Sequence, residues 1–512
     1  MDLVHPVVVI DFGSQYTQLI ARRIREMHVA AVILPFSRPL EELAQLQPPA
    51  MILSGGPASV YDPGSPQCDP AVFQLGVPLL GICYGFQSMA AALGGKVERA
   101  LRREYGFGQL RIIPPSDLLK GLPSSIRVWN SHGDHVVEPP PGFRVTGKTE
   151  NAISVIENPS ARMYAVEFHP EVRHTERGMD ILRHFIFDLC GIKPNWFPSS
   201  FVESTVRHIR TQVGQRRALC AISGGVDSLV AATLVGQAIG ERLTCVFVNN
   251  GLLRKGEFEK VSTALEGQPH LSVQAVDYSS CFLRELQGVT DPEQKRKIIG
   301  REFIRAFEKE ARKLGHIEYL VQGTLYPDVI ESVSVQGPAA VIKSHHNVGG
   351  LPPDLKFQLI EPLKELFKDE VRLVGRELGL EEELINRQPF PGPGLAVRIL
   401  GEVTEDALTT VRDADDIVQQ EVHRAGLASQ LWQYFAVLLP VSSVGVMGDA
   451  RSYASTVAIR AVVSDDGMTA DWARLPADLV ERMATRIVNE VHGVNRVVLD
   501  VTSKPPATIE WE

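Results

Sequence analysis

Short apolar runs alternate with amphipathic stretches over residues 1–190. VVVID at 7–11 and VPLLGICYG at 77–85 are short and almost free of polar residues, as expected of buried strands in a parallel sheet. Between them, TQLIARRIREM at 17–27 repeats its apolar residues at helical spacing. This alternation of strands and helices predicts a parallel α/β domain. Further strands are expected at 50–57 and 162–171, and a further helix at 179–190.

The alternation resumes after a segment with two prolines, GIKPNWFPSS at 191–200, which we interpret as a linker. The run QPFPGPG at 388–394 cannot continue a helix or a strand, so it marks a second boundary. We therefore predict an α/β multidomain protein, with parallel-sheet α/β domains at 1–192 and 196–388 and a small α+β domain at 389–512. Strands are expected at 217–222, 243–250, 318–324, 456–463 and 496–503, and a helix at 229–240.

Length and composition agree with several globular domains. A chain of 512 residues, at about 150 residues per domain, suggests roughly three domains. Apolar residues make up 44% and charged residues 22%, near the averages of globular proteins. The 52 basic and 61 acidic residues give a net charge of −9, which argues against binding nucleic acid or an anionic membrane, because both need a positive footprint. An anionic small substrate is still compatible with this charge.

The cysteines indicate a reducing compartment. None of the six belongs to a Cys-x-x-Cys pair, and six in 512 residues are too few for a disulfide framework. No basic segment precedes the first apolar run, so no leader peptide is expected. No apolar stretch reaches the ~18 residues of a membrane span. We therefore expect a cytoplasmic enzyme without a membrane partner.

Cys83 lies in the sequence GICYG, between a predicted buried strand and a predicted helix. This Gly-x-Cys-x-Gly arrangement is the thiol counterpart of the Gly-x-Ser-x-Gly turn, which exposes a nucleophile at the end of a strand. Because the positive end of a helix dipole favours a thiolate, we expect the helix to lower the pKa of Cys83. The pentapeptide alone is equally consistent with a buried structural cysteine.

Two other strand ends carry groups that would complete a catalytic site. The sequence His169-Pro170-Glu171 follows the strand AVEF, and there a histidine can act as a base that a glutamate orients. The glycines of SGGP at 54–57 leave backbone N–H groups that could stabilise an oxyanion. Each motif alone is more often an ordinary strand end or turn. Their presence together in one α/β unit favours nucleophilic catalysis by Cys83.

Residues 1–190 resemble class I glutamine amidotransferase domains of the triad type, through SGGP, GICYG and HPE in this order. The resemblance implies that Cys83 attacks the carboxamide of glutamine, that His169 transfers the proton, and that Glu171 orients His169. It also implies an oxyanion hole formed by the backbones of Gly56 and Tyr84. The products would be glutamate and ammonia.

A candidate phosphate-binding loop follows the first strand of the second α/β unit. Adjacent glycines let successive N–H groups turn toward an anion, and the dipole of the following helix adds to the attraction. The serine hydroxyls can donate to phosphate oxygens, and Asp227 is a candidate ligand of Mg²⁺. An ordinary glycine-rich turn is the alternative, which fits SGG alone better than the full hexapeptide. The hexapeptide SGGVDS consists of Ser223, Gly224, Gly225, Val226, Asp227 and Ser228.

This hexapeptide resembles the PP-loop of N-type ATP pyrophosphatases. The resemblance implies that the loop binds the β,γ-pyrophosphate of ATP with Mg²⁺, and that no organic cofactor is tightly bound. The implied chemistry is adenylation, in which a substrate oxygen attacks the α-phosphorus and pyrophosphate leaves. Ammonia from the first domain could then displace AMP from the activated carbon.

Four further segments resemble the glutamine-hydrolysing GMP synthetase family. The implied substrates are glutamine, ATP and xanthosine 5′-monophosphate (XMP), which is adenylated and then aminated to GMP. The resemblance also implies a homodimer formed through the C-terminal domain. The segments are GTLYPDVIES at 323–332, KSHHNVGGLP at 343–352, QPFPGPGLAVR at 388–398 and SKPPATIEWE at 503–512.

The same resemblance implies positions for the nucleotide sites. Lysine and arginine suit a 5′-phosphate, while a carboxylate can accept from a purine N–H. Met447 stands where some members of the family carry glutamine, and no contact is assigned to it. The implied XMP contacts are Arg296, Arg398, Lys504 and Glu510, and the implied lid over the nucleotide contains Lys343, His345 and His346.

Two other functions fit parts of the sequence. One is another glutamine-dependent PP-loop ligase that acts on a carboxylate or a tRNA base. The net negative charge argues against tRNA, and the sequence at 503–512 argues against a small carboxylate. The other is a non-catalytic nucleotide sensor, against which the joint presence of Cys83, His169, Glu171 and Asp227 argues.

Overall fold

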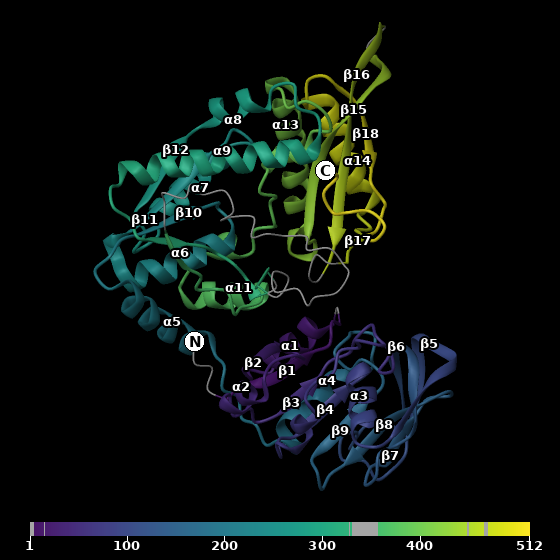
Figure 1. The fold of residues 1–512 in the computed structure, drawn as a ribbon. Coiled ribbons are helices and arrows are strands. Elements are labelled where there is room, and N and C mark those ends of the chain that lie inside the picture. The colour runs from purple at the N-terminus through teal and green to yellow at the C-terminus, as the bar shows by residue number, and fades with distance from the viewer. Residues whose placement is uncertain (1–4, 15, 327, 330–356, 448–449, 465–468) are drawn as a thin grey trace. The chain divides into compact units, whose positions relative to one another are not determined.

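The computed structural model describes residues 5–14, 16–326, 328–329, 357–447, 450–464 and 469–512 (Figure 1). The chain divides between Phe201 and Val202 into two compact units, called here the first unit and the second unit. The first unit contains the predicted cysteine site, and the second unit contains the predicted phosphate loop.

A nine-stranded sheet forms the centre of the first unit, in the order β2-β1-β3-β4-β9-β8-β7-β5-β6. The strands from β2 to β9 in this order are parallel. β4 (Leu79–Ile82) and β9 (Met163–Val166) are buried throughout, which explains their apolar sequences. All four strands expected in this region are present, although some are shorter than predicted. The other parallel strands are β1 (Val7–Asp11), β2 (Ala31–Pro35) and β3 (Met51–Leu53).

Four antiparallel strands extend this sheet beyond β9, and the apolar runs did not predict them. Two of them, β5 (Lys96–Ile112) and β6 (Ser125–Glu138), form a long ribbon. In β6, buried positions alternate with exposed or half-buried ones, so the strand contains no continuous apolar run. The other two strands are β7 (Arg144–Lys148) and β8 (Ile153–Asn158).

The helices expected at 17–27 and 179–190 are confirmed, the second as α4 followed by a π-helical turn. The linker predicted at 191–200 is too long, because α5 already begins at Pro198. Proline suits the first position of a helix, where its missing N–H would have no acceptor within the helix. The helices are α1 (Thr17–Glu26), α2 (Leu40–Gln45), α3 (Tyr84–Ala92), α4 (Gly178–Arg183) and α5 (Pro198–Val213), with a 3₁₀ helix at Pro70–Gln74 and the π-helical turn at His184–Leu189.

A five-stranded parallel sheet, β12-β11-β10-β13-β14, forms the first part of the second unit. β10 (Ala218–Ile222) leads into the predicted phosphate loop, and α6 (Val226–Ile239) follows the loop. The three strands and the helix predicted here are confirmed. The other elements are β11 (Leu243–Asn249), β12 (Val273–Asp277), β13 (Tyr319–Val321), β14 (Gln358–Ile360), α7 (Glu257–Glu266), α8 (Ser279–Leu286), α9 (Pro292–Lys313), α11 (Lys368–Glu377) and α12 (Glu382–Ile385).

A four-stranded sheet, in which β16 pairs with β15, β17 and β18, forms the C-terminal part of the second unit. Residues 388–393 form neither helix nor strand, as their prolines and glycines predict. Within the described part of the chain, no helix has the length and apolar content needed to cross a membrane. The elements are a 3₁₀ helix at Gly394–Arg398, β15 (Gln433–Met447), β16 (Ala450–Val463), β17 (Asp471–Trp472), β18 (Val494–Leu499), α13 (Glu405–Arg424) and α14 (Ala477–Glu490).

One hydrophobic core joins the two parts of the second unit. Leu219 of β10 and Val246 of β11 are buried in the same cluster as Ile417 of α13, Val457 of β16 and Ile487 of α14. Each part therefore covers apolar surface of the other. The boundary near residue 388 remains a prediction about domain organisation.

Candidate active sites

A sharp turn between β4 and α3 carries Cys83. Its backbone angles, φ 53° and ψ −110°, are rare for residues with a side chain and persist where the surrounding structure enforces them. The flanking glycines are required because the turn is crowded. A Cβ atom at Gly85 would lie 2.3 Å from the Leu53 carbonyl oxygen, and one at Gly81 would lie 2.9 Å from the carbonyl carbon of Gly85. The sequence GICYG thus forms a strand, a tight turn and the start of a helix.

His169 and Glu171 lie just beyond β9, the neighbour of β4 in the sheet. Because Ile82 pairs in register with Val166, the two strands end at the same edge. His169 Nδ1 lies 2.7 Å from Glu171 Oε1, and the imidazole also interacts with the Cys83 thiol. All three side chains are buried. The structure therefore brings the three predicted residues together.

Burial and charge determine the protonation of this group. Burial raises the pKa of Cys83, and His169 opposes the rise only in part. The N–H of Tyr84, at the start of the helix, lowers this pKa as expected, but burial outweighs it because burial deprives the thiolate of its hydration. Burial also acts to lower the pKa of His169, but Glu171 and Cys83 outweigh it and raise that pKa well above its ordinary value. His169 is therefore a stronger base than free imidazole.

Backbone N–H groups lie beside the thiol. The N–H of Cys83 donates to the Val166 carbonyl at 2.9 Å, whereas the N–H of Tyr84 interacts with the Cys83 sulfur. In the part of the chain that the structure describes, the N–H of Gly56 has no protein acceptor. Gly56, Tyr84 and Cys83 line the same cavity. Two N–H groups placed in this way could hold a developing negative oxygen.

The cavity beside Cys83 has a volume of about 820 Å³. Its wall contains the acidic residues Asp62 and Asp134 and the basic residues Arg99 and Arg103. Asp134 Oδ2 is buried and has no hydrogen-bond partner among the described residues. The cavity can therefore accept a small ligand that carries both a cation and an anion.

A second buried contact next to Cys83 was not predicted from the sequence. Gln87, on α3, donates its Nε2 to Glu167 Oε1 at 2.7 Å. The contact joins the helix that follows Cys83 to the strand end that carries His169. Burial raises the pKa of Glu167 to about 7. The only signal in the sequence is the position of Gln87 in the first turn of the helix that follows Cys83.

The loop between β10 and α6 has the features of an anion site. Gly224 has φ +75°, so a side chain at this position would be strained. The hydroxyls of Ser223 and Ser228 lie 3.1 Å apart. Because α6 begins at Val226, the first N–H groups of the helix have no acceptor within the helix. These hydroxyl and N–H donors together suit a phosphate group.

Asp227, in the first turn of α6, forms an ion pair with Lys368 at the start of α11. Its second oxygen, Oδ1, is buried and has no hydrogen-bond partner among the described residues. A free carboxylate oxygen beside a phosphate loop fits Mg²⁺, which usually binds one or two carboxylates together with substrate phosphates. The described residues contain no group of three His, Cys, Asp or Glu side chains that could hold a metal alone. Sequence reasoning missed Lys368, because nothing near it marks a phosphate site.

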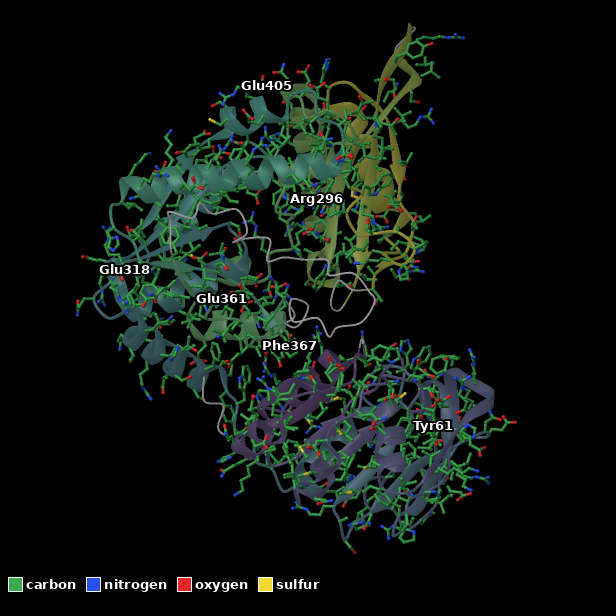
Figure 2. All side chains as sticks on the ribbon, viewed as in Figure 1. Tyr61, Arg296, Glu318, Glu361, Phe367 and Glu405 are labelled. Carbon is green, nitrogen blue, oxygen red and sulfur yellow. The ribbon has the colours of Figure 1, made fainter. Side chains whose placement is uncertain are left out.

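Buried cations hold the tail segment, residues 503–512, in the second unit. Arg398 is fully buried, and its Nη2 and Nε atoms lie 2.9 and 3.1 Å from the carboxylate oxygens of Glu510. Lys295 Nζ donates to Glu512 Oε2 at 2.6 Å. Arg296, which is labelled in Figure 2 and lies on α9, donates to the Glu512 carbonyl oxygen. Arg398 and Glu510, both predicted ligand contacts, are therefore partners of each other in this structure.

For the remaining predicted residues, the structure gives backbone contacts only or no description. Lys504 forms a two-way backbone bridge with Ala470, with N–O distances of 2.7 and 3.0 Å. The expected lid residues Lys343, His345 and His346 lie outside the described residues, and so does the side chain of Met447.

Comparisons with known proteins cover nearly the whole chain. The family model "Glutamine amidotransferase class-I" matches residues 8–189, and "GMP synthase C terminal domain" matches residues 420–511. A curated protein of Thermosynechococcus vestitus, named as a glutamine-hydrolyzing GMP synthase, is 55% identical over 99% of this chain and 96% of its own length. Proteins of the same name from a Parafrankia strain and from Syntrophomonas wolfei are 58% and 56% identical, each over 99% of this chain and over 96% and 99% of their own lengths.

Proposed function

Because the chain belongs to the family of glutamine-hydrolysing GMP synthases, we propose that its two sites perform the two halves of GMP synthesis. The chain is a ligase that takes its nitrogen from glutamine and its energy from ATP. Ammonia is released at Cys83 in the first unit. XMP is activated and aminated at the phosphate loop in the second unit. The buried contact of His169 with both Glu171 and Cys83 is the observation that carries this assignment.

In the first unit, His169 accepts the proton of the Cys83 thiol as the sulfur attacks the carboxamide carbon of glutamine. The raised pKa of His169 favours this transfer. The N–H groups of Gly56 and Tyr84 hold the oxygen of the tetrahedral intermediate. When the intermediate collapses, His169 returns the proton to the departing nitrogen, and ammonia leaves a glutamyl thioester. Water then hydrolyses the thioester to glutamate and regenerates the thiol.

Charged groups in the cavity wall give the site its preference for an amino acid. Asp134 Oδ2, buried and without a described partner, would accept from the α-ammonium group of glutamine. Arg99 and Arg103 supply positive charge for the α-carboxylate. The neutral carboxamide is left to reach Cys83.

In the second unit, the loop at residues 223–228 binds the pyrophosphate portion of ATP. Its helix N-terminus and its serine hydroxyls provide donors for phosphate oxygens. Asp227 would hold Mg²⁺ through Oδ1, and the bound ion would neutralise charge on the phosphates. An oxygen of XMP attacks the α-phosphorus and pyrophosphate leaves. Ammonia then adds to the activated purine carbon and AMP departs.

The tail segment is proposed to contact XMP. Arg296, Lys504 and Glu510 belong to this proposed site, and Arg398 would act by holding Glu510 through its two buried contacts. A cation suits the 5′-phosphate and a carboxylate suits the purine N–H groups. The buried contacts of the tail with Arg398 and Lys295 support this role, because a partly ordered segment loses less entropy when a ligand binds.

An assay of the whole reaction tests the assignment. The protein would be incubated with glutamine, ATP, Mg²⁺ and XMP, and the nucleotides separated by chromatography. GMP and AMP are expected in equal amounts. Amination of a different acceptor in place of XMP would assign the chain to another PP-loop ligase. Binding of nucleotides without any turnover would indicate a sensor.

Glu171→Gln is expected to move the acidic limb of the pH–rate profile for glutamine hydrolysis to lower pH. The Glu171 carboxylate raises the pKa of His169, so removal of its charge lowers that pKa. The neutral imidazole that accepts the thiol proton then persists to a lower pH. Initial rates of glutamate release across the pH range measure the shift. Glu176→Gln, which changes an exposed glutamate paired with Arg127, is the matched control and should leave the limb in place. An unshifted limb in Glu171→Gln would refute the role of Glu171.

Lys504→Ala is expected to weaken XMP binding by roughly ten- to a hundred-fold, because a lost charge-assisted contact costs about 1.5–3 kcal/mol. Titration calorimetry with XMP measures the change. Arg496→Ala, at an exposed cation of β18, is the control and should bind XMP like the parent. If Lys504 serves only to pack the tail, the variant will lose thermal stability while its XMP affinity stays unchanged.

We also propose that the protein is a cytoplasmic homodimer. The antiparallel pair of β15 and β16 carries exposed apolar side chains at Val444, Val446 and Tyr453, and Val444 lies directly opposite Tyr453. Exposed apolar side chains grouped on one strand pair are typical of an interface with another chain. Two copies of the chain would associate through the same surface on each copy, so the assembly would close as a dimer. Sedimentation of the purified protein should therefore give twice the mass of one chain.

A further inference from the structure

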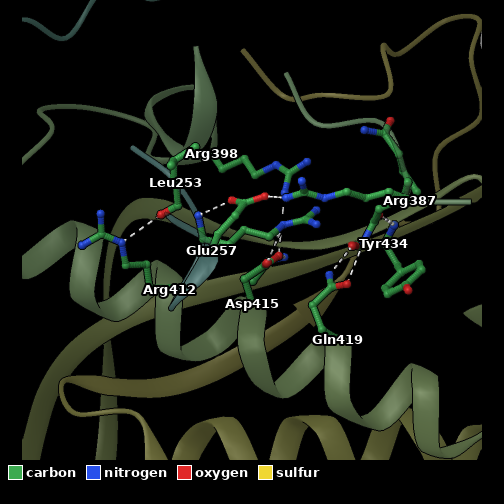
Figure 3. Close-up of polar contacts among 12 residues, drawn as sticks. Leu253, Glu257, Arg387, Arg398, Arg412, Asp415, Gln419 and Tyr434 are labelled. Atoms are coloured by element: carbon green, nitrogen blue, oxygen red, sulfur yellow. Dashed lines mark hydrogen bonds and ion pairs between the residues drawn. The ribbon is translucent and has the colours of Figure 1, made fainter. Parts of the chain in front are cut away.

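Six charged side chains of alternating sign connect the phosphate loop to the tail segment within the second unit. Figure 3 shows four of them, Arg387, Glu257, Asp415 and Arg398, gathered beside α13. The segments that supply them lie far apart in the sequence. In spatial order from the loop, the charged row consists of Arg387, Glu257, Arg254, Asp415, Arg398 and Glu510.

The charged row begins at the phosphate loop itself. Arg387 Nη1 donates to the carbonyl oxygen of Gly224 at 2.8 Å. The same guanidinium forms an ion pair with Glu257, at the start of α7. Glu257 Oε2 in turn accepts from the backbone N–H of Arg254 at 2.7 Å. The position of the loop is thus connected through one arginine to the position of Arg254.

Asp415 of α13 lies at the middle of the charged row. Its Oδ2 is 3.1 Å from Arg254 Nε, and its Oδ1 is 3.7 Å from Arg398 Nη1. The backbone N–H of Ala436 also donates to Oδ1 at 3.1 Å. Asp415 is only 1% exposed, and its Oδ2 forms no hydrogen bond among the described residues, so its charge is balanced chiefly by the electrostatic attraction of these two arginines.

The charged row ends in the tail segment. Arg398 is 0% exposed and contacts Glu510 through two atoms. The side-chain amide of Gln433 donates to the same carboxylate at 3.2 Å. Glu510 therefore takes its position from Arg398, which in turn depends on Asp415.

Buried charges of this kind cannot move independently. An ion withdrawn from water has no solvent to replace a lost partner, so separation of a buried pair is strongly unfavourable. The row contains three cations and three anions, and its charges balance. Burial lowers the pKa of Arg387 to about 10, and it lowers the pKa of Arg254 as well, which shows how strongly both are desolvated. When one side chain of the row moves, its charged partner therefore has to move with it, because water cannot take the place of the lost contact.

We propose that the charged row couples the ATP loop to the XMP-binding tail, with Asp415 as the positioning residue that links the two halves. This inference rests on the proposed function, which assigns ATP to the loop and XMP to the tail. A ligand that immobilises residues 223–228 fixes Gly224, and through it the row and Glu510. The conformational entropy of the row and of Glu510 is then lost when ATP binds to the loop, so XMP binding has less entropy to lose. XMP therefore binds more tightly when ATP occupies the loop.

The test measures the dissociation constant of XMP with and without a saturating non-hydrolysable ATP analogue and Mg²⁺. The ratio of the two constants is the coupling factor. The parent protein should give a factor of roughly 5–150, the usual range of coupling between sites. Asp415→Asn keeps the shape of the side chain and removes its charge, and its factor should fall to near one. Reciprocity requires the affinity for the ATP analogue to change with XMP by the same factor.

Glu421→Gln is the matched control. Glu421 lies further along α13, is 0% exposed and is paired with Arg424, Arg482 and Arg486, none of which belongs to the charged row. This variant also loses a buried carboxylate charge on the same helix, so a general loss of stability affects it equally. Its coupling factor should stay at the parent value.

A coupling factor of one in the parent, or an unchanged factor in Asp415→Asn, overturns the proposal. An equal loss of coupling in Glu421→Gln also overturns it, because the effect would then be one of stability. Should Asp415→Asn fail to fold, Glu257→Gln interrupts the row nearer the loop and is expected to lower the factor in the same way. A parent protein that binds no XMP under any condition refutes the proposed function instead.

Discussion

Replacement of Cys83 with alanine is expected to abolish GMP formation from glutamine while formation from ammonium salts continues. The sulfur is the atom proposed to attack glutamine, and no neighbouring side chain of the triad can replace it. Loss of a catalytic nucleophile lowers a rate by on the order of 10⁴-fold or more. The ammonia-dependent reaction needs only the sites of the second unit, whose residues are unchanged. GMP formation with each nitrogen source is measured side by side on the same preparation.

Cys68→Ala provides the matched control, because Cys68 is another buried cysteine of the first unit and does not line the cavity. It should use glutamine like the parent. A folded Cys83→Ala protein that lacks both activities would contradict the separation of the two chemistries.

Asp227→Asn is expected to depress AMP and pyrophosphate formation with both nitrogen sources. The substitution removes the charge proposed to hold Mg²⁺ and also leaves Lys368 without its carboxylate partner. Loss of one electrostatic contact to a reacting group commonly costs on the order of 10²-fold in rate. Release of pyrophosphate in the presence of XMP and ammonium measures the adenylation step directly.

Asp277→Asn is the control for this experiment. Asp277 also lies at the end of a strand of the same sheet, but it accepts from the N–H of Ser279 at 2.8 Å. It should retain adenylation. Near-normal pyrophosphate release by Asp227→Asn would show that Asp227 has a different role.

The sequence predicted that the residues of the first site would lie together, because they follow buried apolar strands. Cys83 and His169 come directly after β4 and β9, and parallel neighbours end at one edge of a sheet. The positions of the apolar runs therefore predict that residues following neighbouring parallel strands lie close together at that edge. The same approach did not predict β5 and β6, since half-buried antiparallel strands contain no continuous apolar run.

Residues that act through distant partners could not be predicted in this way. Lys368 reaches Asp227, and Arg387 reaches Gly224, across more than a hundred residues of sequence. Each lies in a local sequence typical of an exposed helix or turn. Only the packing of the second unit brings these side chains together. The direction of the Cys83 pKa shift likewise depends on the depth of burial, which the pentapeptide GICYG does not reveal.

The shared core of the second unit determines where the polypeptide can be cut. A fragment ending near residue 388 would lose Ile417, Val457 and Ile487, and would expose the apolar side chains of Leu219 and Val246 that pack in the same cluster. Such a fragment is expected to aggregate instead of folding alone. An ammonia-using synthetase separated from its glutaminase must therefore keep everything from the start of α5 to the C-terminal strands. We therefore expect that the glutaminase unit can be replaced by another ammonia-producing domain, fused to the second unit just before Pro198.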